Sequence, residues 1–427
     1  MSDSRPFEIV VLADFVPAER GRALACAIDL DTLDSFLGTF RPRLELGLDF
    51  CDELELSSAA QLHPDALCAL VHGLSALLEA RAEAHDPARI AELVAEAGAR
   101  IEPDAAASAP ARPRGDRPPV SDRALLDELL GGAPRADTDP VRRLARSLGA
   151  AAGRAEHAAI DRRRAALDAE LGRRLRALLG DPELRRLEAL CLGLRALARC
   201  APDPERLRIR AVHAPLDGLE RAAAQIAGAS FLIAAHGFGA DAAGLARLRA
   251  LALLAQGAGV SALACADPGA LAAGGFQGSA WEKLRGDAVA GRIGLCHPRV
   301  LARLPYGART DAIDALAFEE LAREADASSF VWCDGALAAG RALARCVTET
   351  GDARALARFL ILPDLPVYAG AEAEGLQAQG PTEVTLSERE AERLVARGLS
   401  PIVAMRGSDQ ARMPALLSIS GRSLVGA

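Results

Sequence analysis

The stretch "SFLIAAHGFGADAAGLARLRALALLAQGAGVSALACAD", residues 230–267, decides the fold class. It begins with an apolar run of strand length, continues through a segment at 241–256 that we expect to be helical, and ends with a second short apolar run. A strand, a helix and another strand in this order form the parallel unit of α/β sheets. We therefore predict an α/β fold.

Further strands are expected on both sides of this unit. "FEIVVLAD" at 7–14 has the β-rich composition of a buried strand. "RLRIRAV" at 206–212 alternates arginine with apolar residues, which predicts a strand with one solvent-exposed basic face. "RLELGLDFCDELELS" at 43–57 alternates as a long strand or a hairpin. The remaining strand candidates are "GRIGL", "SSFVWC", "LPVYA" and "SPIVAM".

Helices are expected at about 64–83, 86–99 and 140–200. The last of these is predicted to break at "GDPE", residues 180–183, because glycine ends a helix and Asp-Pro starts one. Asp31 is placed to cap a shorter helix with one apolar face. That face consists of Leu33, Phe36, Leu37 and Phe40.

Residues 100–121, "RIEPDAAASAPARPRGDRPPVS", have the composition of an extended, disordered linker, since they are rich in Pro and Ala and show no apolar period. The linker divides the chain into an αβ domain at 1–99, the linker itself, a helical lead-in at 122–200 and an α/β domain at 201–427. The predicted fold class is thus mixed αβ, with a helical segment after a disordered linker.

The composition argues against several classes of function. A net charge of −8 and a pI near 5.6 disfavour nucleic-acid binding, because a surface that follows phosphates needs a basic excess. The nine cysteines are odd in number and form no CxxC pair, which favours free thiols in a reducing compartment. No apolar run approaches the roughly 18 residues of a membrane span, and no signal-peptide pattern is present. We expect a cytoplasmic protein.

"AAHGFGAD" at 234–241 is the strongest signal for an enzyme, because a Gly-rich turn after a strand can hold an oxyanion or a phosphate. The chain has no G-x-S-x-G, and its glycines here miss the dinucleotide spacing. The seven histidines show no metal-ligand spacing, and no lysine-bearing phosphate loop is present. Acidic pairs such as Glu319-Glu320 are interpreted as solvated faces. We predict no catalytic residue, no cofactor and no metal, and keep a small-molecule α/β enzyme as the least favoured alternative.

Several stretches, in collinear order, resemble the contractile sheath proteins of type VI secretion systems. The stretches that resemble the small sheath subunit, TssB (VipA), are "PFEIVVLADF", "AIDLDTLDSFLGTFRPRLEL" and "LHPDALCALVHGLSALLEARAE". Those that resemble the large subunit, TssC (VipB), are "DPELRRLEALCLGLRAL", "LRIRAVHAPLDGLERA", "SAWEKLRGDAVAGRIGLCHPRVLARLPYG", "FEELAREADASSFVWCDGALAAGRAL" and "PTEVTLSEREAERLVARGLSPIVAMRGSD". The resemblance covers roughly residues 6–99 for the small subunit and 122–420 for the large one.

The resemblance implies a structural role. In this family the two subunits pair, stack in a helical array around an inner tube and share strands between neighbouring protomers; contraction drives the tube outward, and an AAA+ ATPase recycles the sheath. The implied partners are other sheath subunits, the inner tube protein, the baseplate and that ATPase, in an oligomer without nucleic acid. The residues that match the family's motifs, and are therefore expected to be structural or interface residues, are Asp14, Asp29, Arg299, Arg303, Leu304, Pro305, Tyr306, Gly307, Trp332, Pro381, Thr382, Glu383 and Val384.

"HPRVLARLPYGAR" at 297–309 is expected from this resemblance to be a framework loop of the large-subunit fold. In that role Pro305 fixes the entry, Gly307 permits the turn, and Tyr306 offers packing surface and a hydroxyl. Arg299 and Arg303 are expected to pair with acidic groups, either within the chain or between protomers.

The sequence departs from the family pattern in four ways. From the resemblance we expect the two subunits to be fused through the 100–121 linker, and fusion would turn a bimolecular pairing into an intramolecular one. Cys191 stands where the large subunit commonly has a tryptophan, and the segment before "FLIAAHGFGAD" is shortened. The chain ends at "SISGRSLVGA", where large subunits usually continue, so a C-terminal truncation is expected.

Two interpretations follow: a fused sheath component, or a sheath-fold adaptor, cap or regulator that binds sheath, baseplate or ATPase without forming sheath.

Overall fold

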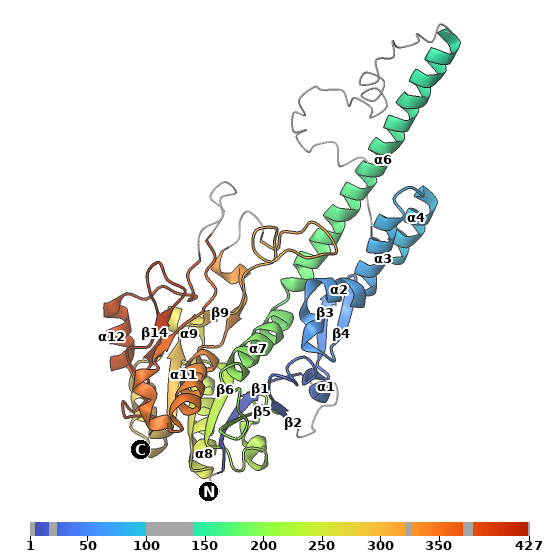
Figure 1. Cartoon of the computed structure of the whole chain (residues 1–427). Coiled ribbons are helices and arrows are strands. Elements are labelled where there is room, and N and C mark those ends of the chain that lie inside the picture. Colours follow the sequence, from blue (N-terminus) through green and yellow to red (C-terminus); the bar gives the residue numbers. More distant parts are fainter. Residues whose placement is uncertain (1–4, 17–23, 100–139, 322–325, 370–378, 426–427) are drawn as a thin grey trace. The chain divides into compact units, whose positions relative to one another are not determined.

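The computed structural model describes residues 5–16, 24–99, 140–321, 326–369 and 379–425, and between 140 and 155 it describes only the course of a helix (Figure 1). The chain divides into two compact units. The first, called the sheet unit, consists of Met1–Val71 and Leu175–Ala427, and the second, called the helical unit, of His72–Arg174. The linker expected at 100–121 lies outside the described residues.

A seven-stranded mixed sheet forms the centre of the sheet unit, in the order β12-β8-β7-β6-β1-β5-β2. Neighbouring strands are parallel except at β2, which runs antiparallel to β5. The strands are β1 (Phe7–Ala13), β2 (Ala25–Ile28), β5 (Leu207–His213), β6 (Phe231–Phe238), β7 (Ser261–Ala266), β8 (Ile293–His297) and β12 (Ser400–Pro401). The predicted α/β fold is confirmed, and so is the unit at 230–267, in which α8 (Ala242–Gly257) connects β6 to β7.

β1 lies in the middle of this sheet, between two strands that come much later in the chain. Its register aligns Phe7 with Leu207 of β5 and Ile9 with Phe231 of β6. The five residues from Ile9 to Ala13 are fully buried. A parallel strand whose two faces are both covered needs a continuous apolar run, which is why "FEIVVLA" fits this position.

Helices cover both faces of the sheet (Figure 1). On one face Leu232 of β6 packs in the same core as Leu248 and Leu251 of α8. On the other face α11 (Gly335–Thr350) approaches so closely that a side chain at Gly340 would collide with Ile233 of β6. α7 (Pro182–Ala198) packs beside α11. Because successive side chains of a strand point to opposite faces, the sheet is the middle of three layers.

Shorter elements complete the sheet unit. The hairpin expected at 43–57 is formed by β3 (Arg43–Leu48) and β4 (Cys51–Glu55). The other small strands are β9 (Val300–Leu301), β10 (Trp332–Cys333), β11 (Ile361–Leu362), β13 (Val403–Ala404) and β14 (Ala411–Arg412). The remaining helices are α1 (Leu37–Phe40), α2 (Pro64–Leu70), α9 (Pro268–Ala272), α10 (Ser279–Arg285) and α12 (Glu388–Ala396), with 3-10 turns at η1 (Ala59–Leu62), η3 (Leu219–Ala224), η4 (Ala288–Arg292), η5 (Ala327–Ser329) and η6 (Ala353–Arg358). Within the described residues, "LPVYA", predicted as a strand, makes a single bridge, between Tyr368 and Gln379.

The helical unit consists of α3 (His72–Ala82), α4 (Pro87–Glu96) and the part of α6 (Pro140–Leu179) that precedes Leu175. Arg174 of α6 is only 1% exposed. Its guanidinium donates to the carbonyl oxygens of Gly73 and Ala97, at 3.0 and 2.7 Å, and pairs with Glu170. These acceptors compensate for the water that the guanidinium loses, which is what allows a charged group to be buried between three helices.

The break expected at "GDPE" is confirmed. α6 ends at Leu179, and α7 begins at Pro182 with Asp181 as its N-cap. The Asp181 carboxylate accepts hydrogen bonds from the backbone N–H groups of Glu183 and Leu184. Proline at the first helical position has no N–H group that would need a partner there.

The helix expected after Asp31 is shorter than predicted. Only Leu37–Phe40 is helical, and residues 30–36 form turns. The physical reason is that Asp29 accepts hydrogen bonds from the backbone N–H groups of Asp31 and Thr32 and so stabilises a turn. The predicted apolar face is nevertheless buried, because Phe36 and Phe40 pack against Phe15.

Replacing Leu12 with alanine tests whether β1 shares one cooperative core with the later strands. Leu12 is fully buried, so Leu12→Ala is expected to lower the free energy of unfolding by about 2–5 kcal/mol. Unfolding in urea is followed by the fluorescence of Trp281 and Trp332, the two tryptophans of the chain, both in the sheet unit. Leu30→Ala is the matched control, since Leu30 is 49% exposed and a change within about 0.5 kcal/mol is expected. An unchanged tryptophan transition in Leu12→Ala would contradict a shared core.

Candidate functional site

Most of the motif residues singled out in the sequence come together around β9. On one side β9 pairs with β10, which holds Trp332. On its other side runs the segment 381–384, where the N–H of Leu301 donates to the carbonyl of Pro381 at 2.9 Å. The N–H of Glu383 in turn donates to the carbonyl of Arg299 at 3.1 Å. Three segments that are about 30 and about 80 residues apart in the sequence thus pair side by side in an extended conformation. We call residues 299–310 the motif loop.

Arg299 pairs with Glu383 through two hydrogen bonds. Its Nε donates to Oε2 at 2.8 Å, and its Nη2 donates to Oε1 at 2.6 Å. This fork is the geometry in which a guanidinium binds a carboxylate most strongly. Thr382 beside it is fully buried, and its hydroxyl donates to the carbonyl of Val384 at 3.0 Å. Of the two kinds of pairing expected for Arg299, the structure has the intrachain one.

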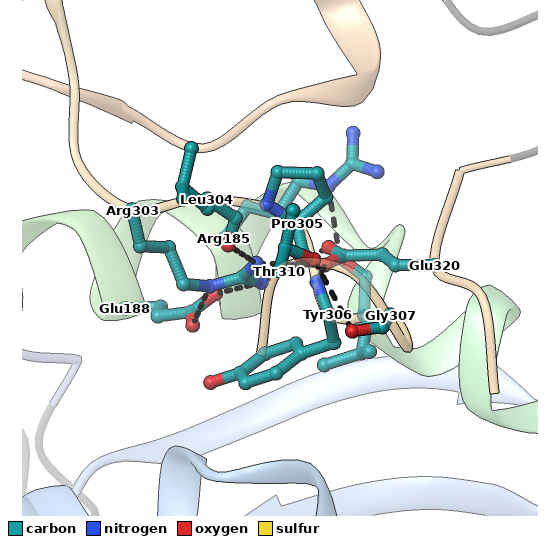
Figure 2. A network of polar contacts seen from close by, with 10 residues as sticks. Arg185, Glu188, Arg303, Leu304, Pro305, Tyr306, Gly307, Thr310 and Glu320 are labelled. Carbon is teal, nitrogen blue, oxygen red and sulfur yellow. Dashed lines mark hydrogen bonds and ion pairs between the residues drawn. The ribbon is translucent and has the colours of Figure 1, made fainter. Parts of the chain in front are cut away.

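Arg303 lies between two carboxylates, Glu188 of α7 and Glu320, and the three side chains point toward one another (Figure 2). The guanidinium donates to Glu188 at 2.6 and 3.2 Å and to Glu320 at 2.7 and 2.9 Å. The side chains of Arg303, Glu188 and Glu320 are 11%, 6% and 3% exposed. We call these three residues the Arg303 cluster. Its bonds are charge-assisted and tie the motif loop to α7.

The Arg303 cluster holds two carboxylates for one guanidinium. Glu320 also accepts a hydrogen bond from the backbone N–H of Tyr306 at 2.8 Å, whereas the two bonds to Glu188 both come from Arg303. Desolvation raises the pKa of Glu188 in spite of the attraction of Arg303. Glu188 is thus held by fewer donors than Glu320, and its charge is incompletely compensated.

Tyr306 packs its ring against the guanidinium of Arg303, whose central carbon lies 4.1 Å from the ring centroid. Desolvation raises the pKa of its phenol, and the Glu188 carboxylate raises it further. Gly307 follows, and a side chain at this position would collide with the carboxylate of Glu319. Glu319 in turn accepts a hydrogen bond from the N–H of Ala308 at 3.1 Å. Because Glu319 is exposed and its carboxylate ends a flexible side chain, that carboxylate can move aside, and the contact alone sets no strict requirement for glycine at 307.

The N-terminal segment of the chain contacts the motif loop and the residues that follow it. The ring of His63 meets that of Tyr306 edge to face, with 5.3 Å between the centroids. The carboxylate of Asp65 accepts hydrogen bonds from the backbone N–H groups of Asp314 and Ala315, at 3.1 and 2.8 Å. Residues from the first 71 positions therefore hold a loop that lies about 250 positions later.

Trp332 belongs to a buried cluster with Leu301, Phe330 and Tyr368. Its indole N–H donates to the carbonyl of Ala327 at 2.7 Å, so its polar group is satisfied. Leu304 of the motif loop packs against the same cluster, and the loop thereby has an apolar attachment besides its ionic one. Pro305 accepts a hydrogen bond at its carbonyl from the hydroxyl of Thr310, which closes the turn.

Two of the expected site residues, Asp14 and Asp29, lie in turns after β1 and β2 instead of at the motif loop. The carboxylate of Asp14 accepts a hydrogen bond from the N–H of Val16 at 2.9 Å, and its carbonyl accepts one from Arg186 at 2.7 Å. Asp29 accepts a bond from the N–H of Thr32 at 2.8 Å. In both residues the carboxylate stabilises a local turn.

His236, in the stretch that gave the strongest enzyme signal, is bonded to the backbone. Its Nε2 donates to the carbonyl of Ala214 at 2.9 Å. Desolvation lowers the pKa of His236 to about 4, although the bond to Ala214 and the charge of Asp14 oppose the shift. A neutral histidine in this setting connects the ends of β5 and β6. Across the described ranges, no three His, Cys, Asp or Glu side chains are grouped to hold a metal ion.

Neither carboxylate of the Arg303 cluster was among the residues predicted from the sequence. The interpretation of Glu319-Glu320 as a solvated face is wrong for Glu320, which is buried. These two residues are not helical, so helical spacing says nothing about which of them faces water. For Glu188 a signal exists in the sequence: it is a lone acid on the buried stripe of α7 that includes Leu184 and Leu187. A charge at such a position indicates a partner elsewhere in the fold.

The fold and the site define an α/β protein whose motif residues make internal contacts. Residues 271–420 match the VipB family model, EvpB/VC_A0108, tail sheath N-terminal domain. The chain is also similar to the type VI secretion system sheath protein TssC1 of Pseudomonas aeruginosa, with 32% identity over 141 residues. That similarity covers 30% of this chain and 27% of the relative, so the chain spans about a quarter of the relative's length.

These matches show that residues 271–420 are similar to the N-terminal domain of TssC-like sheath proteins. The matched range contains the motif loop, Trp332 and the segment 381–384. Glu188 and Asp65, which bind the loop region, lie outside it. In the part of the chain that the structure describes, no helix combines the length and the apolar character needed to cross a bilayer.

Removing the guanidinium of Arg303 would leave two buried carboxylates close to each other. Arg303→Met is therefore expected to lower the free energy of unfolding by about 3–5 kcal/mol. Glu188→Gln leaves Arg303 paired one to one with Glu320, and the expected change is below about 1 kcal/mol. Urea unfolding measures both. Arg41→Met is the control, because the Arg41–Glu55 pair has side chains 66% and 44% exposed and such pairs contribute about 0–1 kcal/mol. If Arg303→Met and Arg41→Met lowered the free energy of unfolding equally, a buried cluster would be ruled out.

The lowered pKa of His236 predicts a specific loss of stability in acid. Because folding lowers this pKa from 6.5 to about 4, the unfolded chain binds the proton first as the pH falls. Neutral His236 therefore contributes fully to the free energy of unfolding above about pH 6.5. This contribution is lost as the pH falls from there to about 4, and the loss is at most about 3 kcal/mol. His236→Gln keeps an N–H donor for Ala214 but binds no proton, so unfolding free energies at pH 7.5 and 4.5 are expected to differ less than in the wild type. His72→Gln, at a side chain 69% exposed, is the control. The prediction fails if His236→Gln shows the full wild-type difference.

Proposed function

We propose that this protein is a structural component of a type VI secretion contractile sheath, acting through protein–protein assembly around an inner tube. The observation that carries the proposal is the match of residues 271–420 to the VipB tail sheath N-terminal domain. The matched range includes the motif loop, whose ion pairs are internal. In this role those pairs stabilise the subunit, and its surfaces make the contacts with other subunits.

The proposal includes a fusion of two sheath-like parts. Residues 1–99 are the small-subunit-like part, 100–121 the linker, 122–200 the helical lead-in and 201–427 the large-subunit-like α/β domain. What supports a fusion is the way in which the N-terminal residues complete the sheet unit, with β1 between β5 and β6 and Asp65 bonded to residues 314 and 315. A covalent linker holds one part near the other at an effective concentration on the order of mM, which favours their pairing.

The partners in this proposal are other sheath subunits and the inner tube protein, with the baseplate and an AAA+ recycling ATPase as further partners, all in the cytoplasm. Contacts between unlike surfaces that do not close on themselves generate helical arrays, which is the symmetry that a sheath requires. The net charge of −8 disfavours nucleic acid as a partner.

Assembly can be tested by producing the chain alone, with a type VI inner tube protein and with a separate sheath subunit, and by examining each sample by negative-stain electron microscopy. Ordered tubes that require the inner tube protein are the expected result. Single particles that co-purify with a sheath subunit would indicate the adaptor, cap or regulator instead. Single particles that bind neither protein would overturn both roles.

A further inference from the structure

A pocket of about 310 Å3 opens between α7 and the N-terminal segment, within the sheet unit. We call it the α7 pocket. This volume is at the lower end of the roughly 300–1,000 Å3 found for ligand sites, so it suits one long side chain better than a cofactor. The polar residues around it are Asp34, His63, Glu188, Arg195 and Tyr306.

The α7 pocket is apolar along its walls and polar at its two ends. The apolar part of its lining includes Leu62, Leu192 and the short side chain of Cys191. At the outer rim Asp34 and Arg195 form an ion pair at 2.8 Å, with side chains 68% and 37% exposed. The inner end is formed by groups that are almost inaccessible to water, and a ligand that reaches them must itself leave water.

The inner end holds a buried carboxylate with unused hydrogen-bonding capacity. Glu188 lines the pocket, is 4% exposed and belongs to the Arg303 cluster, in which two carboxylates share one guanidinium. Each of its oxygen atoms accepts one hydrogen bond from Arg303, and an ionised carboxylate oxygen has two acceptor sites. A further cation beside Glu188 would use the remaining acceptor sites and would stabilise the charged form of this carboxylate, which burial disfavours. At the rim, by contrast, Asp34 is already balanced by Arg195.

We propose that the α7 pocket binds the side chain of an arginine residue presented by a partner polypeptide, with its guanidinium against Glu188 and its methylene groups between Leu62 and Leu192. The apolar walls match the aliphatic stem, and the acidic inner end matches the charged tip. Arginine fits better than lysine because its planar group is less strongly hydrated and binds a carboxylate through two bonds. The inference does not rest on the sheath function, since it uses only the chemistry of the pocket.

A polypeptide is a better source of this side chain than the free amino acid. Free arginine would bring an ammonium and a carboxylate to the rim, where Asp34 and Arg195 already satisfy each other. Within a polypeptide these two charges are replaced by neutral peptide groups. Arginine is also among the residues enriched at protein–protein interfaces.

Saturation-transfer NMR with small probes tests the proposal on the full chain. The probes are acetyl-arginine amide, acetyl-citrulline amide, which has the same length without the charge, and free L-arginine. The expected result is a saturable signal for acetyl-arginine amide that is at least fivefold stronger than the signal for the citrulline probe, with free arginine weaker than the amide. Equal signals from the arginine and citrulline amides would overturn the proposal. Tighter binding of free arginine would overturn the polypeptide source.

Two variants locate the binding in the α7 pocket. Cys191→Phe fills the pocket from within, and Ala60→Trp covers it from an exposed position on its lining. Each is expected to abolish the signal of acetyl-arginine amide, whereas Cys191→Ser keeps the space and is expected to retain it. The tryptophan fluorescence transition in urea shows whether Cys191→Phe folds, and Ala60→Trp decides the matter if it does not. A full signal in folded Ala60→Trp would place the binding elsewhere and overturn the assignment.

Discussion

The position of β1 between β5 and β6 is the constraint on which the rest of the structure depends. The backbone groups of a buried central strand must be paired on both sides, and β1 achieves this through parallel ladders with two strands of the later sequence. The ion pair of Glu8 with Arg210, at 2.9 Å, reinforces the same junction. Without β1 the sheet would have two open edges in its middle, which is why residues up to Val71 belong to the compact unit that also holds the C-terminal half.

The arginines at the start of α7 explain how loops are attached to this core in a chain with very little lysine. Arg185 donates to the carbonyl oxygens of Leu179 and Ser328, and Arg186 donates to that of Asp14. A guanidinium has five donors in a fixed plane, so one side chain can satisfy carbonyl groups from two segments at once. Backbone groups that would otherwise be left unpaired at helix ends and turns are thereby stabilised. The Arg303 cluster follows the same principle with carboxylates in place of carbonyls.

Local features of the structure could be predicted from the sequence, and features that depend on distant partners could not. The unit formed by β6, α8 and β7, the buried strand β1 and the break before α7 follow from apolar runs and caps, which act over a few residues. The helix after Asp31 was overestimated, because a turn bonded by Asp29 competes with it. An apolar run does not indicate which strands will lie beside it in the sheet, so the order of strands around β1 could not be predicted. The family resemblance pointed to Arg303, but its acceptors Glu188 and Glu320 are brought to it only by the tertiary fold.

The distance along the chain between β1 and its partners also sets an order of events during synthesis. The residue opposite Phe7 is Leu207, so about 200 residues must be translated before the first ladder can form. At about 5–20 residues per second this takes about 10–40 s. The hairpin of β3 and β4 and the helices α2 to α4 need only near neighbours and can form within that time. Meanwhile an apolar strand without a partner is open to pairing with other nascent chains. The ribosome, and not the intrinsic rate of strand pairing, therefore limits when this protein acquires its core.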